Sequence, residues 1–239
     1  MNNILELENI NAFYDKSHIL FDINIQIAEG QSVCILGRNG VGKSTTMKTI
    51  MGMINPKENA ATTGKILFYG KNVAGLPAYK ISQKGIAYVP QGRHIFPTLT
   101  TRENLLISER SSPDGKKTWT LNKIYELFPR LKERENSKGG KLSGGEQQML
   151  AIARGLMQNP HLLLLDEITE GLAPIIVRQL VEIVQELMRR KVSILVAEQN
   201  VKFALSVSDD CYILEKGAVA YHEATKLLGK ETILRYLGT

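Results

Sequence analysis

The first part of the chain alternates apolar and polar residues, which is the pattern of half-buried β-strands. Leu5 and Leu7 alternate with glutamates in ILELENI, and isoleucines alternate with asparagine and glutamine in DINIQIAEG. A period of two with one polar face is typical of antiparallel strands. We therefore expect an antiparallel β part near the start of the chain.

Three later apolar runs show no such alternation. They are short and almost wholly apolar, and they read SVCIL, HLLLLD and SILVAE. Such runs fit strands that are buried on both faces, as in a parallel sheet covered by helices. Helical patterns separate them at Lys43–Met53, Glu146–Met157 and Ile175–Arg190. Strands that alternate with helices predict an α/β core with a mostly parallel sheet.

The stretch between these blocks has a different character. Residues 97–141 lack long apolar strand runs, whereas TRENLLISER and LNKIYELFPRLKERE have the pattern of amphipathic helices, with a loop at SSPDGKK. We interpret 97–141 as a helical subdomain inserted into the core. The chain is then one domain, 1–239, with residues 1–96 and 142–239 forming the α/β core and its antiparallel β part.

Composition and charge narrow the class of protein. The 239 residues are 43% hydrophobic and 23% charged, which is ordinary for a soluble globular protein. The net charge of +6 is spread among acidic residues, as in RLKERENSK, so it indicates a solvated surface and not nucleic-acid binding. Cys34 and Cys211 lie in apolar runs and are expected to be reduced core residues of a cytosolic protein. The start of the chain does not read as a signal peptide, and no apolar run approaches the ~18–20 residues of a membrane span.

A glycine-rich motif follows the run SVCIL. Gly37–Ser44 reads GRNGVGKS and opens a predicted helix, which is the context of a phosphate-binding loop. In such a loop the glycines let backbone amides wrap the phosphates. Lys43 reaches the outer phosphates, and the Ser44 hydroxyl binds Mg²⁺.

Two acidic residues end the run HLLLLDE. Asp166 follows a buried strand, from which it can reach the metal ion held by Ser44. Glu167 is then placed to orient and deprotonate an attacking water. The alternative is that Glu167 is only a surface residue of a turn.

The stretch KLSGGEQQM, Lys141–Met149, places two glycines where a helix starts. A glycine inside a helix costs ~1 kcal/mol relative to alanine. Ser143 and Glu146 have the spacing of a capping box, but that motif requires neither glycine. Either the stretch is a helix cap alone, or Gly144 and Gly145 let an anion approach the backbone at the helix N-terminus.

The order of four motifs resembles a known family. The phosphate loop, Gln91 in YVPQGR, LSGGEQQ and LLLLDE together resemble the nucleotide-binding subunit of an ATP-binding cassette (ABC) transporter, from Leu5 to Gly238. The resemblance implies an ATPase with ATP and Mg²⁺ as cofactors, built as a P-loop core with an antiparallel β part and a helical subdomain. It also implies a head-to-tail pair, in which each ATP lies between the phosphate loop of one subunit and the LSGGEQQ signature of the other.

Roles for individual residues follow from this resemblance. Tyr14 matches an aromatic that stacks on adenine; the alternative is a core aromatic at the end of a strand. Gln91 matches a residue that touches Mg²⁺ or water and leads into the helical subdomain. The expected catalytic residues are Lys43, Glu167 and Gln199, and the expected metal contacts are Ser44, Gln91 and Asp166. The expected nucleotide contacts are Tyr14, Gly37, Asn39, Gly40, Gly42, Lys43, Ser44, Thr45, Gln91, Ser143, Gly144 and Gly145.

The resemblance also implies partners and a location. A homologous but non-identical second ATPase subunit would complete the pair, and integral membrane permease subunits would dock on the helical subdomain. A solute-binding protein would act indirectly, and no nucleic acid is expected. The chain would work at the cytoplasmic face of the cell membrane as a peripheral subunit.

Three positions depart from the family pattern. Ile168 stands where a proline usually follows the catalytic glutamate, and Ala173 stands where an aspartate is usual. Gln199 replaces the usual histidine; it can hydrogen-bond a γ-phosphate but cannot carry a proton. These departures keep open a nucleotide-gated binding module with little turnover, whereas the intact Lys43, Asp166 and Glu167 favour an active ATPase.

Smaller motifs point to a subgroup. TEGLAP, GRNGVGKST, YVPQGR and YLGT resemble ATPase subunits of branched-chain amino acid importers. YVPQGR together with the following IFP slightly favours a sister subgroup, the ATPase subunits of importers for urea and short amides. A soluble ABC protein of ribosomes or DNA usually has two cassettes or a long coiled-coil insertion, and this sequence has neither. The solute itself cannot be read from a chain that never touches it.

Overall fold

The computed structural model describes residues 2–54 and 60–238. A four-stranded antiparallel sheet forms the predicted β part, in the order β2-β1-β4-β5. Its strands are β1 (Asn3–Tyr14), β2 (Ser17–Ala28), β4 (Ala60–Phe68) and β5 (Lys71–Asn72). Alternate residues of β1 and β2 are buried, so the period of two predicted these strands correctly.

A six-stranded sheet forms the centre of the molecule, in the order β10-β9-β3-β8-β7-β6. The pairs β9-β3, β3-β8, β8-β7 and β7-β6 are parallel, and only β10 pairs antiparallel. The strands are β3 (Ser32–Leu36), β6 (Ile86–Val89), β7 (Leu162–Asp166), β8 (Ser193–Glu198), β9 (Asp210–Glu215) and β10 (Ala218–Ala224). Every residue of β3, β7 and β8 is buried, which explains their continuous apolar sequences.

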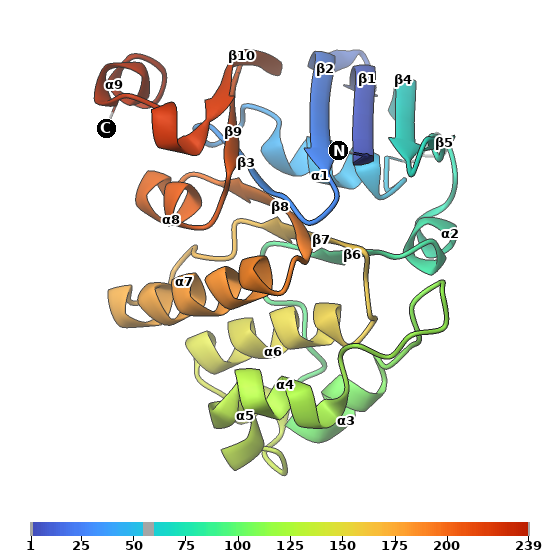
Figure 1. Cartoon of the computed structure of the whole chain (residues 1–239), viewed down its shortest axis with the longest axis vertical. Coiled ribbons are helices and arrows are strands. Elements are labelled where there is room, and N and C mark those ends of the chain that lie inside the picture. The colour runs from blue at the N-terminus through green and yellow to red at the C-terminus, as the bar shows by residue number, and fades with distance from the viewer. Residues whose placement is uncertain (1, 55–59, 239) are drawn as a thin grey trace.

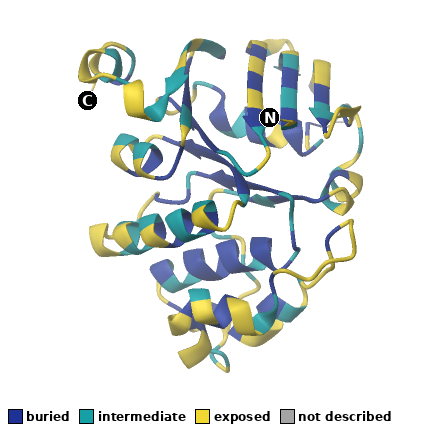
Figure 2. Cartoon of the chain, viewed as in Figure 1, coloured by how far each residue is buried: buried dark blue, intermediate teal, exposed yellow. Residues whose placement is uncertain are grey.

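Each face of this sheet has its own hydrophobic core. Leu162 and Leu164 of β7 pack with the antiparallel sheet and helix α1 (Lys43–Ile50). Leu163 and Leu165 pack with helices α6 (Gly144–Leu156), α7 (Pro174–Arg189) and α8 (Val201–Ser206). Figure 1 shows the antiparallel sheet with α1 above the central strands and the two longest helices, α6 and α7, below them. In Figure 2 the inner strands β3, β7 and β8 are buried, whereas the outer helices are exposed on one side. The fold is the α/β class that the sequence predicted.

The helices connect and cover these sheets. They are α1 (Lys43–Ile50), α2 (Ala78–Gln83), α3 (Thr101–Leu106), α4 (Leu121–Leu127), α5 (Pro129–Glu133), α6 (Gly144–Leu156), α7 (Pro174–Arg189), α8 (Val201–Ser206) and α9 (Lys230–Leu237), with 3-10 turns at Gly139–Lys141 and Thr225–Leu227. None of the helices in the described part of the chain is long and apolar enough to cross a membrane.

Residues 97–141 are helical, but their helices are shorter than the sequence pattern indicated. LNKIYELFPRLKERE forms two helices because Phe128, which precedes a proline, leaves the helical region with φ −125° and ψ 70°. The helix that starts at Thr101 ends at Leu106, short of the predicted stretch. These helices gather around α6 at the bottom of Figure 1. The division into a core and a helical subdomain stays a prediction.

Candidate active site

The loop between β3 and α1 is shaped to hold an anion. Gly40 and Gly42 have φ of 81° and 107°, a region that favours glycine. No side chain caps the amino end of α1, and a cavity of about 290 Å³ lies over this loop. Free amides at the positive end of a helix favour a phosphate. The cavity is lined by Ile19, Asn39, Gly40, Gly42, Lys43, Ser44, Thr45, Gln91 and Glu167.

The Lys43 ammonium lies inside the loop. Its Nζ donates to the carbonyl oxygens of Gly37 at 2.9 Å and Arg38 at 3.0 Å. It also pairs with Glu167 Oε1 at 3.0 Å, with the Lys43 side chain 2% exposed and that of Glu167 13% exposed. The cation expected to bind phosphate and the carboxylate expected to activate water are therefore in direct contact. A phosphate that binds Lys43 would weaken this pair and leave Glu167 available as a base.

Ser44 and Asp166 meet at the carboxyl end of β7. The Ser44 hydroxyl donates to Asp166 Oδ1 at 3.0 Å, and the Tyr88 hydroxyl donates to Asp166 Oδ2 at 2.8 Å. Burial raises the pKa of Asp166, while the two hydrogen bonds lower it in part. Sequence reasoning brought Ser44 and Asp166 together correctly but missed Tyr88, which fixes the other carboxylate oxygen.

Glu167 occupies a tight turn directly after β7. Its φ is 45°, which is uncommon for a residue with a side chain, and its amide donates to the Ala197 carbonyl at 2.8 Å. This backbone bond to the end of β8 holds the turn and aims the carboxylate at Lys43. Gln91 Nε2 donates to Glu167 Oε2 at 3.2 Å and to Glu170 Oε2 at 2.6 Å. The structure thus places Gln91 on two carboxylates and not on Ser44 or Asp166.

Gln199 follows β8 and faces the same region. It is exposed, and it lines a cavity of about 280 Å³ together with Asn39, Glu167 and Glu170. The residue before it, Glu198, is buried and accepts hydrogen bonds from the Thr169 amide at 3.0 Å and the Thr169 hydroxyl at 2.9 Å. Glu198 therefore ties the turn that carries Glu167 to the loop that carries Gln199.

Burial raises the pKa of Glu198 from 4.5 to about 7. Because the folded protein binds this proton more tightly than the unfolded chain does, Glu198 makes the free energy of unfolding fall as pH rises from about 4.5 to about 7. The loss is at most on the order of 3 kcal/mol. Glu198→Gln should flatten that slope in urea unfolding at several pH values, whereas Glu215→Gln, an exposed carboxylate, is the matched control. Equal slopes for wild type and Glu198→Gln would contradict this.

The start of α6 contains the predicted capping box. The Ser143 hydroxyl accepts from the Glu146 amide at 3.3 Å, and Glu146 Oε2 accepts from the Ser143 amide at 2.8 Å. The glycines between them have an intramolecular reason that the sequence did not reveal. A Cβ on Gly144 would lie 2.6 Å from Arg93 Nη1, and one on Gly145 would lie 2.9 Å from Ile176. Both glycines therefore let other parts of this chain pack closely, and their phosphate contact stays a prediction.

The structure brings some of the expected residues together and leaves others apart. Lys43, Ser44, Gln91, Asp166 and Glu167 form one cluster around the phosphate loop. Of the residues that the structure describes, Ser143–Gly145 do not line the cavity over that loop. Tyr14 lies at the end of β1 and is 36% exposed, which rules out the alternative of a core aromatic.

A family comparison decides what this arrangement is. The family model described as ABC transporter matches residues 20–170, which include the phosphate loop, Gln91, the LSGGEQQ signature and Asp166–Glu167. The chain belongs to the ABC transporter family. It is an ABC transporter ATPase, as the order of its motifs indicated.

Individual relatives of this ABC transporter ATPase cover its full length. It is 41% identical over 237 residues to the high-affinity branched-chain amino acid transport ATP-binding protein BraG of Pseudomonas aeruginosa, covering 98% of this chain and 100% of BraG. It is 36% identical to the probable branched-chain amino acid transport ATP-binding protein LivF of Archaeoglobus fulgidus, covering 95% of each chain. The crystal structure of the ABC transporter cassette MJ1267 in its ADP conformation matches with a TM-score of 0.80 and 26% identity, over 99% of this chain and 95% of that one.

Two of the departures from the family pattern, Ile168 and Ala173, lie next to the candidate site of this ABC transporter ATPase. Ile168 is buried in the core beneath the Glu167 turn, and Ala173 begins α7 without a side-chain cap. Neither residue takes a polar group away from the cluster around Lys43 and Glu167.

Proposed function

We propose that this ATPase powers a membrane permease that imports branched-chain amino acids, as one member of a head-to-tail pair. The observation that carries the solute class is the 41% identity to BraG over essentially the whole chain. The observation that supports turnover is the cluster of Lys43, Ser44, Asp166 and Glu167 in contact around the phosphate loop. A module that only bound nucleotide would not need a carboxylate at Glu167.

The residues around β7 fit the metal ion that accompanies ATP. Mg²⁺ prefers hard oxygen ligands and few protein groups, and the Ser44 hydroxyl and the Asp166 carboxylate supply two oxygens 3.0 Å apart. Ser44 and Asp166 would hold this ion, which would supply positive charge to offset the negative charge of the phosphates. Tyr88 holds the second oxygen of Asp166, which leaves one oxygen of that carboxylate on the Ser44 side.

Each polar side chain of the site then has a separate role in ATP hydrolysis. Lys43 binds the outer phosphates and releases Glu167, which orients the attacking water and accepts its proton. Gln91, which donates to Glu167 and Glu170 in this structure, would be free to contact the metal ion or the attacking water once Glu167 engages that water. Gln199, which lines a cavity together with Glu167, hydrogen-bonds the γ-phosphate without changing its own charge.

The Gln199→His variant should acquire a new ionisation in the pH–rate profile of ATP hydrolysis. An unperturbed histidine titrates near ~6.5, whereas glutamine does not titrate. The measurement is kcat at saturating ATP from about pH 5.5 to 8.5, a range that brackets the histidine pKa. Superimposable profiles would show that residue 199 does not touch the reacting phosphate.

Uptake by the assembled transporter tests the solute. Cells or proteoliposomes that contain this ATPase with its permease should accumulate labelled leucine, isoleucine or valine in an ATP-dependent manner, and Lys43→Ala should abolish the uptake. Uptake of urea or acetamide in place of these amino acids would favour the sister subgroup indicated by IFP after YVPQGR.

The proposed assembly places the chain at the cytoplasmic face of the membrane. We propose integral permease subunits and a related but non-identical second ATPase as its direct partners, with a solute-binding protein acting indirectly. Purification of the membrane complex should give two different ATPase chains. A complex that contained only this ATPase would contradict the non-identical pair.

A further inference from the structure

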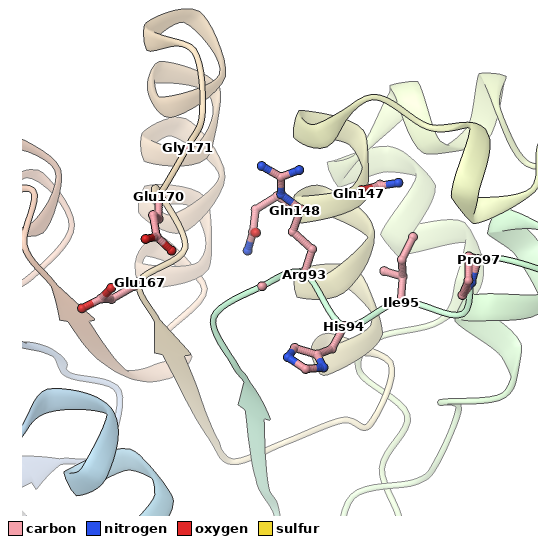
Figure 3. A pocket seen from close by; sticks show the side chains of 10 residues that line it. Arg93, His94, Ile95, Pro97, Gln147, Gln148, Glu167, Glu170 and Gly171 are labelled. Carbon is pink, nitrogen blue, oxygen red and sulfur yellow. The ribbon is translucent and has the colours of Figure 1, made fainter.

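Arg93 lies between two functional loops of the chain. Its guanidinium packs on the first turn of α6, where Nη1 is 2.6 Å and Nη2 is 3.2 Å from the position of a Cβ on Gly144. Nη2 is also 3.8 Å from the position of a Cβ on Gly171, in the turn after Glu167. Figure 3 shows this guanidinium between the helix that carries Gln147 and Gln148 and the turn that carries Gly171. Arg93 thus reaches the same helix end as the LSGGEQQ signature.

The Arg93 guanidinium forms no ion pair with the described parts of the chain. Its side chain forms no hydrogen bond there either. Of the carboxylates across the cavity in Figure 3, Glu167 pairs with Lys43, and Glu170 accepts a hydrogen bond from the neutral Gln91 amide and forms no ion pair with Arg93. A guanidinium beside the positive end of a 13-residue helix is electrostatically unfavourable. An anion at this point would relieve both charges.

A second polar group of the same cavity also lacks a partner. Gln148 is 4% exposed, and its Nε2 has no hydrogen-bond partner among the described residues. It lines the cavity of about 610 Å³ together with Arg93. An unsatisfied buried donor is costly, so this wall of the cavity is built for a hydrogen-bond acceptor. A cation, a free donor and a helix N-terminus on one wall together favour a phosphate group.

We infer that Arg93 is a further residue of the shared nucleotide site and contacts the phosphates of the ATP bound by the partner chain. The inference rests on the head-to-tail pairing proposed above, which brings that ATP to the start of α6. Arginine suits this role because its planar fork can bind two phosphate oxygens at once. Gly144 is then required on two counts, since it makes room for the guanidinium and leaves the amides of the first turn accessible.

The test is ATP-dependent dimerisation in a Glu167→Gln background, in which hydrolysis is blocked. Analytical ultracentrifugation measures dimer formation. The partner is whichever chain the Glu167→Gln parent pairs with, either a second copy of the parent or the second ATPase. Arg93→Met should raise the ATP concentration for half-maximal dimerisation roughly tenfold or more, the size of a hydrogen bond to a charged group. Arg93→Lys should lose less because it keeps the charge. Arg235→Met, which removes an exposed charge on α9, is the matched control and should behave as the parent.

Fluorescent ATP titration of the monomer, phosphate titration and thermal unfolding complete the test. Unchanged dimerisation in Arg93→Met would overturn the inference, and so would a loss of ATP affinity by the Arg93→Met monomer. Binding of inorganic phosphate to the wild-type monomer that Arg93→Met abolishes would reassign the cavity to free phosphate. If Arg93→Met and Arg93→Lys lost ATP-dependent dimerisation equally and both unfolded at a lower temperature, Arg93 would have only a packing role, and the inference would be overturned. If the Glu167→Gln parent does not dimerise with ATP, the head-to-tail pairing itself fails and the inference falls with it.

Discussion

Glu167→Gln is expected to bind ATP and to hydrolyse it about 10²–10⁴-fold more slowly, the usual contribution of a positioned general base. Gln keeps the shape of the side chain but cannot accept the proton of water. Lys43 loses its ion-pair partner at 3.0 Å and is freer to bind phosphate, so ATP affinity should be kept or increased. The variant should therefore accumulate as an ATP-bound dimer. Phosphate release at saturating ATP is the measurement.

The control for this prediction is the same change three residues later. Glu170 also accepts a hydrogen bond from Gln91 but is exposed and does not touch Lys43. Glu170→Gln should keep most of the turnover. Near-normal hydrolysis by Glu167→Gln would show that Glu167 is not the general base. An equal loss of hydrolysis in Glu167→Gln and Glu170→Gln would instead indicate that the position of Gln91, which bonds to both residues, is the cause.

Ser143→Arg is expected to abolish ATP-dependent dimerisation and hydrolysis while leaving ATP binding by the isolated chain intact. Ser143 is exposed at the amino end of α6 and, in the described part of the chain, lies outside the cavity over the phosphate loop. A long cationic side chain there would block the approach of the partner chain's ATP, so the ATP-bound pair could not form when both chains carry the change. The loss of the capping box costs ~1 kcal/mol, which is small beside the stability of the domain.

A milder change at the same position separates capping from phosphate binding. Ser143→Asp keeps a good N-cap residue and adds a negative charge, which would repel the partner's phosphates. It should therefore keep the unfolding temperature of wild type and still lose dimerisation. Loss of ATP binding by monomeric Ser143→Arg would instead mean that the signature serves its own chain's nucleotide.

The hydrophobic pattern predicted the sheets well because burial determines it directly. The alternating residues of β1 and β2 and the continuous runs of β3, β7 and β8 reflect one-sided and two-sided burial. Helix ends were less accurate. The pattern joined α4 and α5 although Pro129 was visible, because an amphipathic period continues across the break at Phe128.

The sequence motifs predicted the residues around the phosphate loop but not the contacts between distant segments. Ser44 and Asp166 are recognisable from spacing alone, and the structure joins them at 3.0 Å. Glu198 and Thr169 are 29 positions apart, and their bonds depend on the pairing of β7 with β8. Arg93 was visible in YVPQGR, but only the fold places it against Gly144. Partnerships of this kind require three-dimensional neighbours that no short motif encodes.

The central claim is that each nucleotide site is shared between two chains, and ATP hydrolysis by a mixture of Ser143→Arg and Lys43→Ala chains tests it most directly. In a mixed dimer both changes fall in one site, and the other site keeps its Lys43 and its Ser143. The test uses the isolated chain without the second ATPase, and cross-linking first verifies that two copies of this chain pair with each other under these conditions. The mixture should then hydrolyse ATP faster than either variant alone. Activity that does not rise above that of the separate variants, in dimers shown to contain both chains, would contradict the shared site.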